Sequence, residues 1–452
     1  MKKRNFLAVL ASLALMTSMF SISANAEGTE EKKETNYTEG LTTATSDGTT
    51  PVSKNTTSFD KYLVMDINAN VPNASFNFAI TKYNDTKDEK AVIVDADSTN
   101  LAVINGVEGA VFKSGAANED TVFTSSDATT NEKDNTNAAV VFKTTDNKED
   151  EKFAAKTLTL DFSKVKFDEP GVYRYLITET GTNQGIANDT GVTGENNTFR
   201  TLDVYVEDYD AYYNSLNEED RANYTAPAGK ELFITGYVLY NGKNDNAPAK
   251  TGGNVTKSTS YTNTYTTHDL TFSKTVKGNQ GSKDKYFKFD VTISNAVAGT
   301  VYTVDLSNAD ATVASNSATN SDYIGKTNPS TIIVPDDNTT VTETFYLQHG
   351  QEINILGLAD GTSYKIEETP EDYVASADVT GDTTDVTDED KKVSDKGLTA
   401  DTKVDFTNDR SGTIPTGVIL SVAAPVVIGL AVLGGIVFLV IRNKKRESEE
   451  EE

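Results

Sequence analysis

The sequence predicts an all-β protein built from two tandem β-sandwich domains. Many short segments rich in Val, Ile, Phe, Tyr and Thr alternate apolar and polar residues with a period of two. This alternation is typical of half-buried strands, and turn-forming clusters of Asn, Asp, Gly and Ser separate the segments. The same ordered set of segments also occurs twice, which divides this part of the chain into residues 58–266 and 267–411.

The N-terminal end has the features of a secretory signal peptide. Residues 2–4 are basic, an apolar stretch follows from Phe6 to about Phe20, and residues 24–26 form a small-residue cleavage site. Residues 1–26 are therefore predicted to be removed on export. Residues 27–57 are polar and rich in Thr, Glu and Gly, so we expect a flexible leader there.

The composition limits the classes of function. The formal net charge of −27 argues against nucleic acid or an anionic membrane as a partner. The chain has no Cys, and its two His, His268 and His349, lie far apart in the sequence. The acidic segment 382–390 lacks the glycine and terminal Glu spacing of a calcium-binding hand. We therefore predict no metal, no cofactor and no enzyme activity.

The strand patterns are clear at several places, for example at 76–80, 158–162, 202–206 and 287–291. Two segments depart from this pattern. Residues 209–224 indicate a short helix or a turn insertion, and residues 379–396 are acidic and resemble a loop.

The two copies share four elements in the same order. Each copy opens with a strand that contains Lys, continues with a Phe-x-Phe strand and then with a Tyr-x-Ile-x-Glu-Thr strand, and closes with an aromatic-Thr-Asn strand. The elements are 59–63, 76–78, 175–180 and 261–263 in the first copy, and 272–276, 287–289, 364–369 and 406–408 in the second.

Six polar residues in these elements are predicted to point into the cores. Residues two apart on a strand share a face, and each of the six has apolar or aromatic neighbours at that spacing. A buried charge is costly unless it is compensated, so the three residue types are expected to meet within each copy. They are Lys61, Glu179 and Asn263 in the first copy, and Lys274, Glu368 and Asn408 in the second.

Two interpretations of each group are open. The group can be a plain buried ion pair with a satisfied Asn. Alternatively, burial lowers the pKa of the Lys amine and raises that of the Glu carboxyl, so that a neutral amine can attack the Asn side-chain carbonyl. A protonated Glu would then polarise that carbonyl and carry protons as ammonia leaves. The repetition of the pattern and the absence of Cys favour the reactive interpretation.

The C-terminal end predicts membrane anchoring and processing. An uncharged, mainly apolar run at 418–441 is long enough to span a bilayer, and a basic cluster follows it. The preceding Thr413-Ile414-Pro415-Thr416-Gly417 resembles the cell-wall sorting signal of Gram-positive surface proteins, in which a sortase cleaves between Thr and Gly. Ile in place of Leu, with no residue between Pro and Thr, suggests a dedicated pilus-type sortase rather than the housekeeping enzyme.

Residues 58–446 resemble the major (backbone) pilins of Gram-positive sortase-assembled pili, in particular the two-domain streptococcal type with Ig-like, collagen-adhesin-B-like sandwiches. The resemblance rests on the twinned Lys/Glu/Asn pattern, on the Pro-Gly-Val-Tyr at 170–173 ahead of Glu179, and on the Pro-Thr-Gly of the tail. In that family a Lys and an Asn condense into an isopeptide bond with the help of a Glu. The resemblance therefore implies two bonds, Lys61–Asn263 assisted by Glu179 and Lys274–Asn408 assisted by Glu368.

The resemblance also implies partners and a location. A pilus-type sortase would join Thr416 to a lysine of another copy of the chain, and Lys257, with Lys250 and Lys243 as alternatives, matches the acceptor position of relatives. Minor pilins, peptidoglycan and a host ligand are further expected partners, on a secreted, wall-linked pilus that is anchored transiently in the membrane. The implied function is a structural shaft subunit, and the alternative is a wall-anchored adhesin or a minor pilin.

Overall fold

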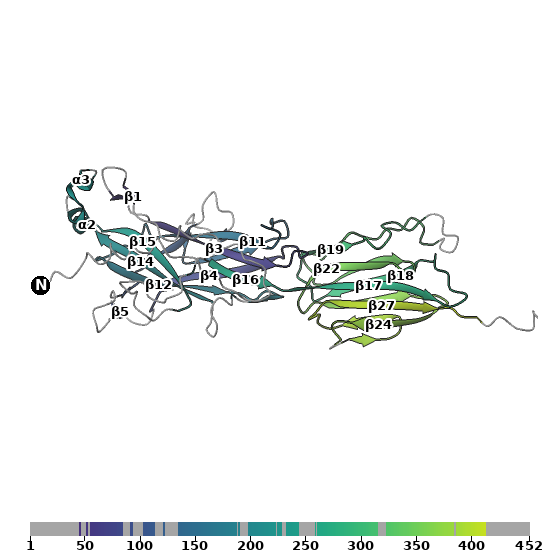
Figure 1. Cartoon of the computed structure of the whole chain (residues 1–452). Coiled ribbons are helices and arrows are strands. Elements are labelled where there is room, and N and C mark those ends of the chain that lie inside the picture. The colour runs from purple at the N-terminus through teal and green to yellow at the C-terminus, as the bar shows by residue number, and fades with distance from the viewer. Residues whose placement is uncertain are drawn as a thin grey trace, which may run out of the picture.

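A computed structural model confirms that the chain is all-β, with many strands and two short helices among the described residues. Figure 1 shows the strands in two groups that follow one another along an elongated molecule, purple to teal first and green to yellow second. The structure describes residues 45–46, 51–52, 55–84, 91–93, 103–113, 121–122, 134–187, 189, 198–222, 224–227, 232–243, 258, 260–314, 322–383 and 386–412.

The first group of strands forms two sheets that share one core. The larger sheet has the order β15-β14-β12-β4-β10-β8, with β6 parallel to β12 and β5 paired with β6, and the smaller has the order β13-β16-β3-β11-β7-β9. The larger sheet consists of β4 (Ala74–Lys82), β5 (Ala91–Ile93), β6 (Val103–Asn105), β8 (Thr121–Val122), β10 (Asn137–Phe142), β12 (Gly171–Thr180), β14 (Phe199–Asp208) and β15 (Leu232–Asn241). The smaller consists of β3 (Thr56–Met65), β7 (Val111–Lys113), β9 (Asp134–Asn135), β11 (Phe153–Asp161), β13 (Ile186–Ala187) and β16 (Ser260–Tyr265).

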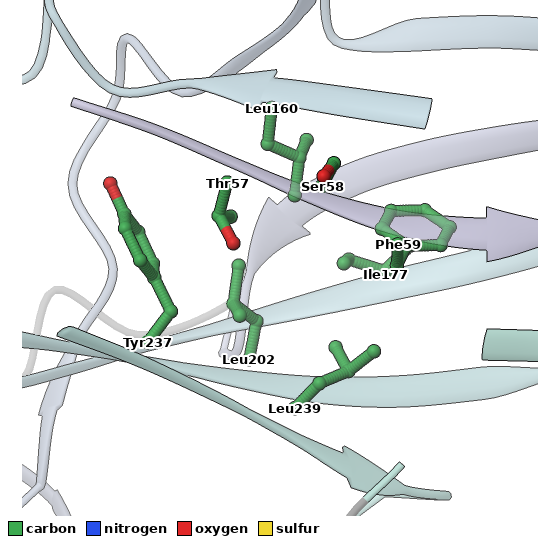
Figure 2. Close-up of a pocket in the computed structure, with 8 residues that line it drawn as sticks. All are labelled: Thr57, Ser58, Phe59, Leu160, Ile177, Leu202, Tyr237 and Leu239. Atoms are coloured by element: carbon green, nitrogen blue, oxygen red, sulfur yellow. The ribbon is translucent and has the colours of Figure 1, made fainter. Parts of the chain in front are cut away.

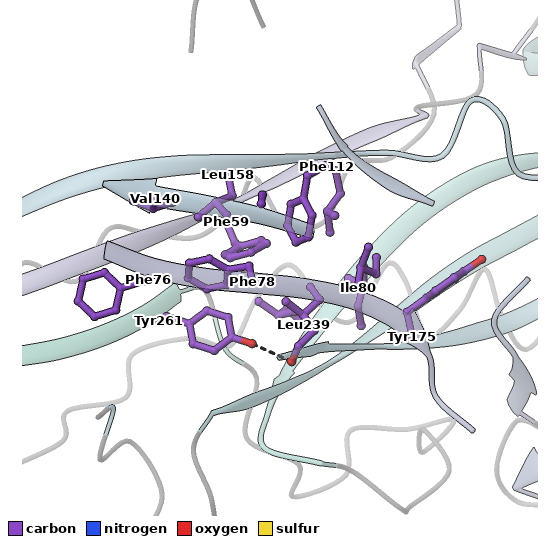
Figure 3. Packing of buried hydrophobic residues seen from close by; sticks show 14 of the residues in the cluster. Phe59, Phe76, Phe78, Ile80, Phe112, Val140, Leu158, Tyr175, Leu239 and Tyr261 are labelled. Carbon is purple, nitrogen blue, oxygen red and sulfur yellow. Dashed lines mark hydrogen bonds between the residues drawn. The ribbon is translucent and has the colours of Figure 1, made fainter. Parts of the chain in front are cut away.

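The core of this group is aromatic, because inward-facing positions of both sheets carry Phe and Tyr. Phe59 of β3, Phe78 of β4 and Tyr261 of β16 meet with ring centroids 5.2–5.9 Å apart (Figure 3). The hydroxyl of Tyr261 donates to the backbone oxygen of Ile177 across the core, at 2.9 Å. Residues on β3 alternate between buried and partly exposed, as the period of two predicts.

The second group repeats this arrangement with a core of its own. One sheet has the order β20-β19-β22-β17-β27-β24, and the other has the order β21-β18-β23-β26-β25. The first consists of β17 (Thr267–Lys277), β19 (Val301–Asp305), β20 (Thr331–Ile333), β22 (Glu352–Ala359), β24 (Val374–Thr380) and β27 (Thr402–Asp409). The other consists of β18 (Phe287–Ser294), β21 (Val341–Leu347), β23 (Ser363–Thr369), β25 (Thr387–Asp388) and β26 (Lys392–Asp395).

In each group the opening strand lies beside the closing strand and runs parallel to it. β3 pairs in parallel with β16, and β17 pairs in parallel with β27. Most other pairs are antiparallel, so this adjacency brings together chain segments that are far apart in the sequence. Thr266 alone separates β16 from β17, which joins the two groups directly.

A few polar contacts tie the groups together beyond that link. The side-chain amide of Asn70 donates to the backbone oxygen of Val301 at 2.7 Å, and that of Asn73 donates to the backbone oxygen of Ala298 at 3.0 Å.

The segment predicted as a helix or turn insertion contains two helices, α2 (Tyr209–Ser215) and α3 (Glu218–Arg221). They lie at the end of the molecule away from the second group (Figure 1). Asp208 caps α2 and Asn217 caps α3, since each side chain accepts from backbone N–H groups of the first turn.

The prediction that residues 379–396 form a loop is wrong in part. β24 extends to Thr380, and β25 and β26 lie within the segment. Acidic composition suggested a solvated loop, but Val393 and Asp395 of β26 alternate inward and are buried.

The ends of the chain are described only in part. Two short strands, β1 (Thr45–Ser46) and β2 (Pro51–Val52), pair within the predicted leader, and β3 begins at Thr56. Within the described ranges no helix is long and apolar enough to span a membrane. The predicted signal peptide and the predicted span at 418–441 lie outside those ranges.

Candidate functional site

The structure brings Lys61, Glu179 and Asn263 together in the first core, each at most 4% exposed. The Lys61 Nζ donates to Glu179 Oε2 at 2.8 Å and also to Asn263 Oδ1. The Asn263 Nδ2 donates to Glu179 Oε1 at 2.9 Å. The Glu179 carboxylate therefore contacts both nitrogens, while the amine lies against the carboxamide oxygen.

Lys274, Glu368 and Asn408 meet in the second core and are equally buried. The Lys274 Nζ lies 2.5 Å from Glu368 Oε1, and the Asn408 Nδ2 donates to that same oxygen at 2.7 Å. Among the described residues Asn408 Oδ1 and Glu368 Oε2 have no hydrogen-bond partner. A buried carbonyl oxygen without a donor is unusual.

The two sites have the same register. Asn263 pairs with Leu63, two residues beyond Lys61, and Asn408 pairs with Val276, two residues beyond Lys274. In each site the Asn therefore occupies the next inward-facing position diagonally across from the Lys.

The Glu comes from the facing sheet in both sites. Glu179 on β12 pairs with Phe78 on β4, and Glu368 on β23 pairs with Phe289 on β18. The three residue types thus meet in each core, and two sheets supply them.

Aromatic rings enclose both amines. The Lys61 Nζ lies 4.0 Å from the ring centroid of Phe76, and the Lys274 Nζ lies 4.6 Å from that of Phe287. These two Phe residues occupy equivalent positions, each two residues before the Phe that pairs with the Glu. The rings exclude water and provide an apolar wall beside each charge.

Burial changes the protonation of these groups. It lowers the pKa of the Lys61 amine to about 8, although the negative charge and hydrogen bond of Glu179 oppose the shift. Burial likewise lowers the pKa of Lys274 to about 8 and raises the pKa of Glu368, each against the attraction of its partner. A pKa near 8 leaves roughly a tenth of the amine neutral at pH 7, compared with less than about a thousandth for an ordinary Lys.

Two buried Arg–Asp pairs in the first group escaped the sequence analysis. Arg200 contacts Asp189 and the backbone of β16, and Arg174 donates to both oxygens of Asp203 at 2.6 and 2.8 Å. An Arg within a strand pattern is usually solvated, and Asp189 lies in a turn-like sequence, so neither pattern marked them.

The remaining predicted site residues are spread over the chain. Lys243 is exposed, with its Nζ 5.3 Å from the ring centroid of Tyr83. Lys250, Lys257 and the sorting motif 413–417 lie outside the described residues.

A small cavity lies beside the first site (Figure 2). Phe59 and Ile177, the strand neighbours of Lys61 and Glu179, line it with other apolar side chains and three hydroxyl-bearing residues. Its lining has no charged group. In the described part of the chain no cluster of three or more His, Asp or Glu could hold a metal ion.

Comparison with known proteins places relatives among the pilins. Residues 268–410 match a family described as "Domain of unknown function (DUF7601)". A protein named Pilin from Streptococcus pyogenes serotype M1 is 25% identical over 302 residues, which cover 63% of this chain and 71% of the relative. This similarity confirms the resemblance to streptococcal pilins that the sequence predicted.

Two solved structures of similar proteins are both pilins of Streptococcus pyogenes. The major pilin matches at 20% identity with a TM-score of 0.47, covering 80% of this chain and 100% of that chain. The major pilin protein T3.2 matches at 18% identity with a TM-score of 0.46, covering 79% of this chain and 99% of that chain.

Proposed function

We propose that this chain is the structural shaft subunit of a covalently polymerised cell-surface pilus. The observation that carries the proposal is the repeated Lys–Glu–Asn group, buried in the same register in both cores. The similarity to a streptococcal pilin over most of the chain supports it. Subunits of this kind assemble with other pilin subunits at the cell surface.

The proposed chemistry is an isopeptide bond in each core, Lys61–Asn263 and Lys274–Asn408. The neutral Lys Nζ attacks the Asn Cγ and forms a tetrahedral intermediate. The Glu takes a proton from the attacking nitrogen and delivers it to Nδ2, which leaves as ammonia. One C–N bond forms and one breaks, so an amine and a primary amide become a secondary amide and ammonia.

The contacts of Glu179 support this route. It accepts a hydrogen bond from the attacking nitrogen and another from the leaving nitrogen, at 2.8 and 2.9 Å. A single carboxyl can therefore carry the proton without moving far. Each bond forms once in the life of the molecule, so the chain modifies itself and does not turn over as an enzyme.

We infer two Ig-like sandwich domains, 58–266 and 267–411, preceded by a signal peptide and a leader and followed by a sortase signal. A pilus-type sortase cleaves between Thr416 and Gly417 and joins Thr416 to a lysine of the next copy, Lys257 being the preferred acceptor. Before cleavage the span at 418–441 anchors the chain in the membrane. Peptidoglycan and minor pilins are the further partners, and a host ligand is compatible with this surface.

The bonds would give the shaft its resistance to force. Each joins the opening strand of a domain to the closing strand beside it, so tension passes through covalent side-chain bonds rather than through the core. By analogy with disulfides, closing a loop of this size also removes roughly 5 kcal/mol of unfolded-state entropy.

The intact mass of recombinant protein covering residues 58–411 tests the chemistry. We expect the mass to fall short of the sequence by two ammonia molecules. A mass equal to that of the unmodified sequence would reject both bonds.

Cell-wall extracts test the shaft role separately. We expect a ladder of very large species that resist sodium dodecyl sulfate. A single wall-linked monomer band would favour the wall-anchored adhesin instead.

A further inference from the structure

Among the described residues, a strand pairs with only part of the β16 edge that faces away from β3. β13 pairs with Tyr265 and Thr264 at one end of β16. Nearer the start of the strand, two side chains bind its backbone. Asp189 Oδ2 accepts from the backbone N–H of Thr262 at 2.8 Å, and Arg200 Nε donates to the backbone oxygen of Ser260 at 3.1 Å.

These two side chains also bind each other. The Arg200 guanidinium donates to Asp189 Oδ2, and its Nε donates to the hydroxyl of Ser258 at 2.8 Å. The guanidinium carbon lies 4.3 Å from the ring centroid of Tyr261, the inward-facing residue of β16 just before Asn263. Arg200 is 2% exposed, so this contact set, which we call the β16 clamp, is protected from water.

The β16 clamp connects the two sheets of the first group. Arg200 lies on β14, where it pairs with Ile177 of β12, two residues before Glu179. It shares its face with Leu202 and Val204 of the core, and its guanidinium reaches across to β16 in the opposite sheet. The strand that carries Asn263 is thereby fixed relative to the sheet that carries Glu179.

The second site is held differently. β24 pairs with β27 in continuous register from Val374 opposite Asp409 to Thr380 opposite Lys403. The strand that carries Asn408 is therefore held on both edges by backbone hydrogen bonds, with β17 on its other side. At the corresponding edge of the first site, the described residues pair with β16 only through Ile186 and Ala187 of β13.

We propose that Asp189 and Arg200 are positioning residues for the Lys61–Asn263 crosslink, holding β16 so that the Asn263 carboxamide stays against the Lys61 amine. This inference rests on the proposed function. Thr262 is adjacent to Asn263, so releasing its N–H frees the carboxamide to shift. A displacement of about 1 Å can slow an intramolecular reaction by roughly a hundredfold.

The test uses the full chain, purified at intervals after a pulse of expression in a host without sortase. Digestion and mass spectrometry then quantify the Lys61–Asn263 and Lys274–Asn408 linked peptides in the same molecules. Asp189→Ala removes the acceptor for Thr262, and we expect a roughly tenfold or greater fall in the early ratio of first-site to second-site peptide. Asp189→Asn retains an acceptor oxygen, so we expect it to restore part of that ratio.

The matched control is Asp203→Asn. Asp203 forms an equally buried pair with Arg174 on the same sheet, but Arg174 lies on the face turned away from the core residues Tyr173 and Tyr175. This variant is expected to lower stability while leaving the ratio unchanged. A merely structural role for Asp189 would make the two variants behave alike.

The outcomes separate the two levels of inference. If the chain without substitutions forms neither bond, the proposed chemistry is rejected. If it forms both bonds and folded Asp189→Ala keeps the normal ratio, the role of the β16 clamp alone is rejected. Should Asp189→Ala not fold, Arg200→Lys decides, because an ammonium cannot reproduce the guanidinium fork. It is expected to reduce the ratio about tenfold, and an unchanged ratio would overturn the proposal.

Discussion

Asn263 lies diagonally across from Lys61, on the adjacent parallel strand and at the next inward-facing position. Asn408 has the same relation to Lys274. Because β16 runs into β17 through Thr266, the closing strand of one site is almost continuous with the opening strand of the other. Two bonds at these positions would leave the short segment between Asn263 and Lys274 as the covalent path for tension from one core to the next, beside the polar contacts of Asn70 and Asn73.

Replacing Glu179 by Ala should abolish the first bond and spare the second. The Glu179 carboxylate contacts both the attacking and the leaving nitrogen, and the second site has its own Glu368 in a separate core. The intact mass should therefore fall short by one ammonia molecule instead of two.

The matched control is Glu207→Ala. Glu207 is also buried in the first group, but its hydrogen-bond partner is Thr235 rather than a reactive residue. Both ammonia molecules should still be lost. If Glu179→Ala still loses two ammonia molecules, the Glu179 carboxyl is not needed for the first bond.

Replacing Asn408 by Ala should weaken the second group of strands. It removes the proposed bond between β17 and β27, and by analogy with disulfides about 5 kcal/mol of unfolding free energy is at stake. Guanidinium unfolding followed by circular dichroism measures the change.

The control for this variant is Asn279→Ala, which removes an exposed Asn whose side chain donates to the backbone oxygen of Gly412. Its effect should stay within about 0.5 kcal/mol. Equal effects of the two substitutions would mean that the second bond contributes little.

The burial of the Lys, Glu and Asn residues could be predicted because strand geometry alone sets which residues share a face. The period of two placed Lys61 beside Phe59 and Leu63, and the structure buries all three. The parallel pairing of the opening and closing strands could not be read in this way, since adjacency of distant strands depends on the topology of the whole sheet.

The β16 clamp could not be predicted for a related reason. Arg200 is buried because Asp189, Ser258 and the edge of β16 converge on it from separate elements. No local sequence pattern predicts that these separate elements meet at Arg200. The strand β26 was missed because the acidic composition around it outweighed the alternation of Val393 and Asp395.

The stability of a chain that cannot form the first bond should rise with pH between about 8 and 10.4. In Asn263→Ala the buried Lys61 remains, and burial lowers its pKa to about 8 in the folded state, compared with about 10.4 unfolded. Between these values the unfolded state binds more protons, so the free energy of unfolding increases with pH. Below about pH 8 both states are protonated, and the cost of the buried ammonium is fully present.

Denaturant unfolding of Asn263→Ala at pH 7, 8, 9 and 10 measures this trend. The double variant Lys61→Met/Asn263→Ala is the reference, since it lacks the amine but keeps the other titrating groups. The difference in unfolding free energy between the single and the double variant should become smaller as the pH rises. A difference independent of pH would mean that the buried amine keeps an ordinary pKa.

Polymerisation should depend on Thr416 and on one lysine near the end of the first domain. Replacing Thr416 by Ala keeps the backbone carbonyl but removes the threonine side chain that sortase would recognise at the cleavage site, so the ladder of large species should disappear. Lys257→Arg keeps the charge but removes the acceptor amine, and it should have the same effect while both intramolecular bonds still form.

Lys243→Arg is the matched control, because this exposed lysine is close in the sequence and we expect its loss to leave the ladder intact. If Lys243→Arg abolishes the ladder and Lys257→Arg does not, Lys243 is the acceptor. If the ladder persists in a triple variant with Lys257→Arg, Lys243→Arg and Lys250→Arg, the acceptor lysine lies in another part of the subunit.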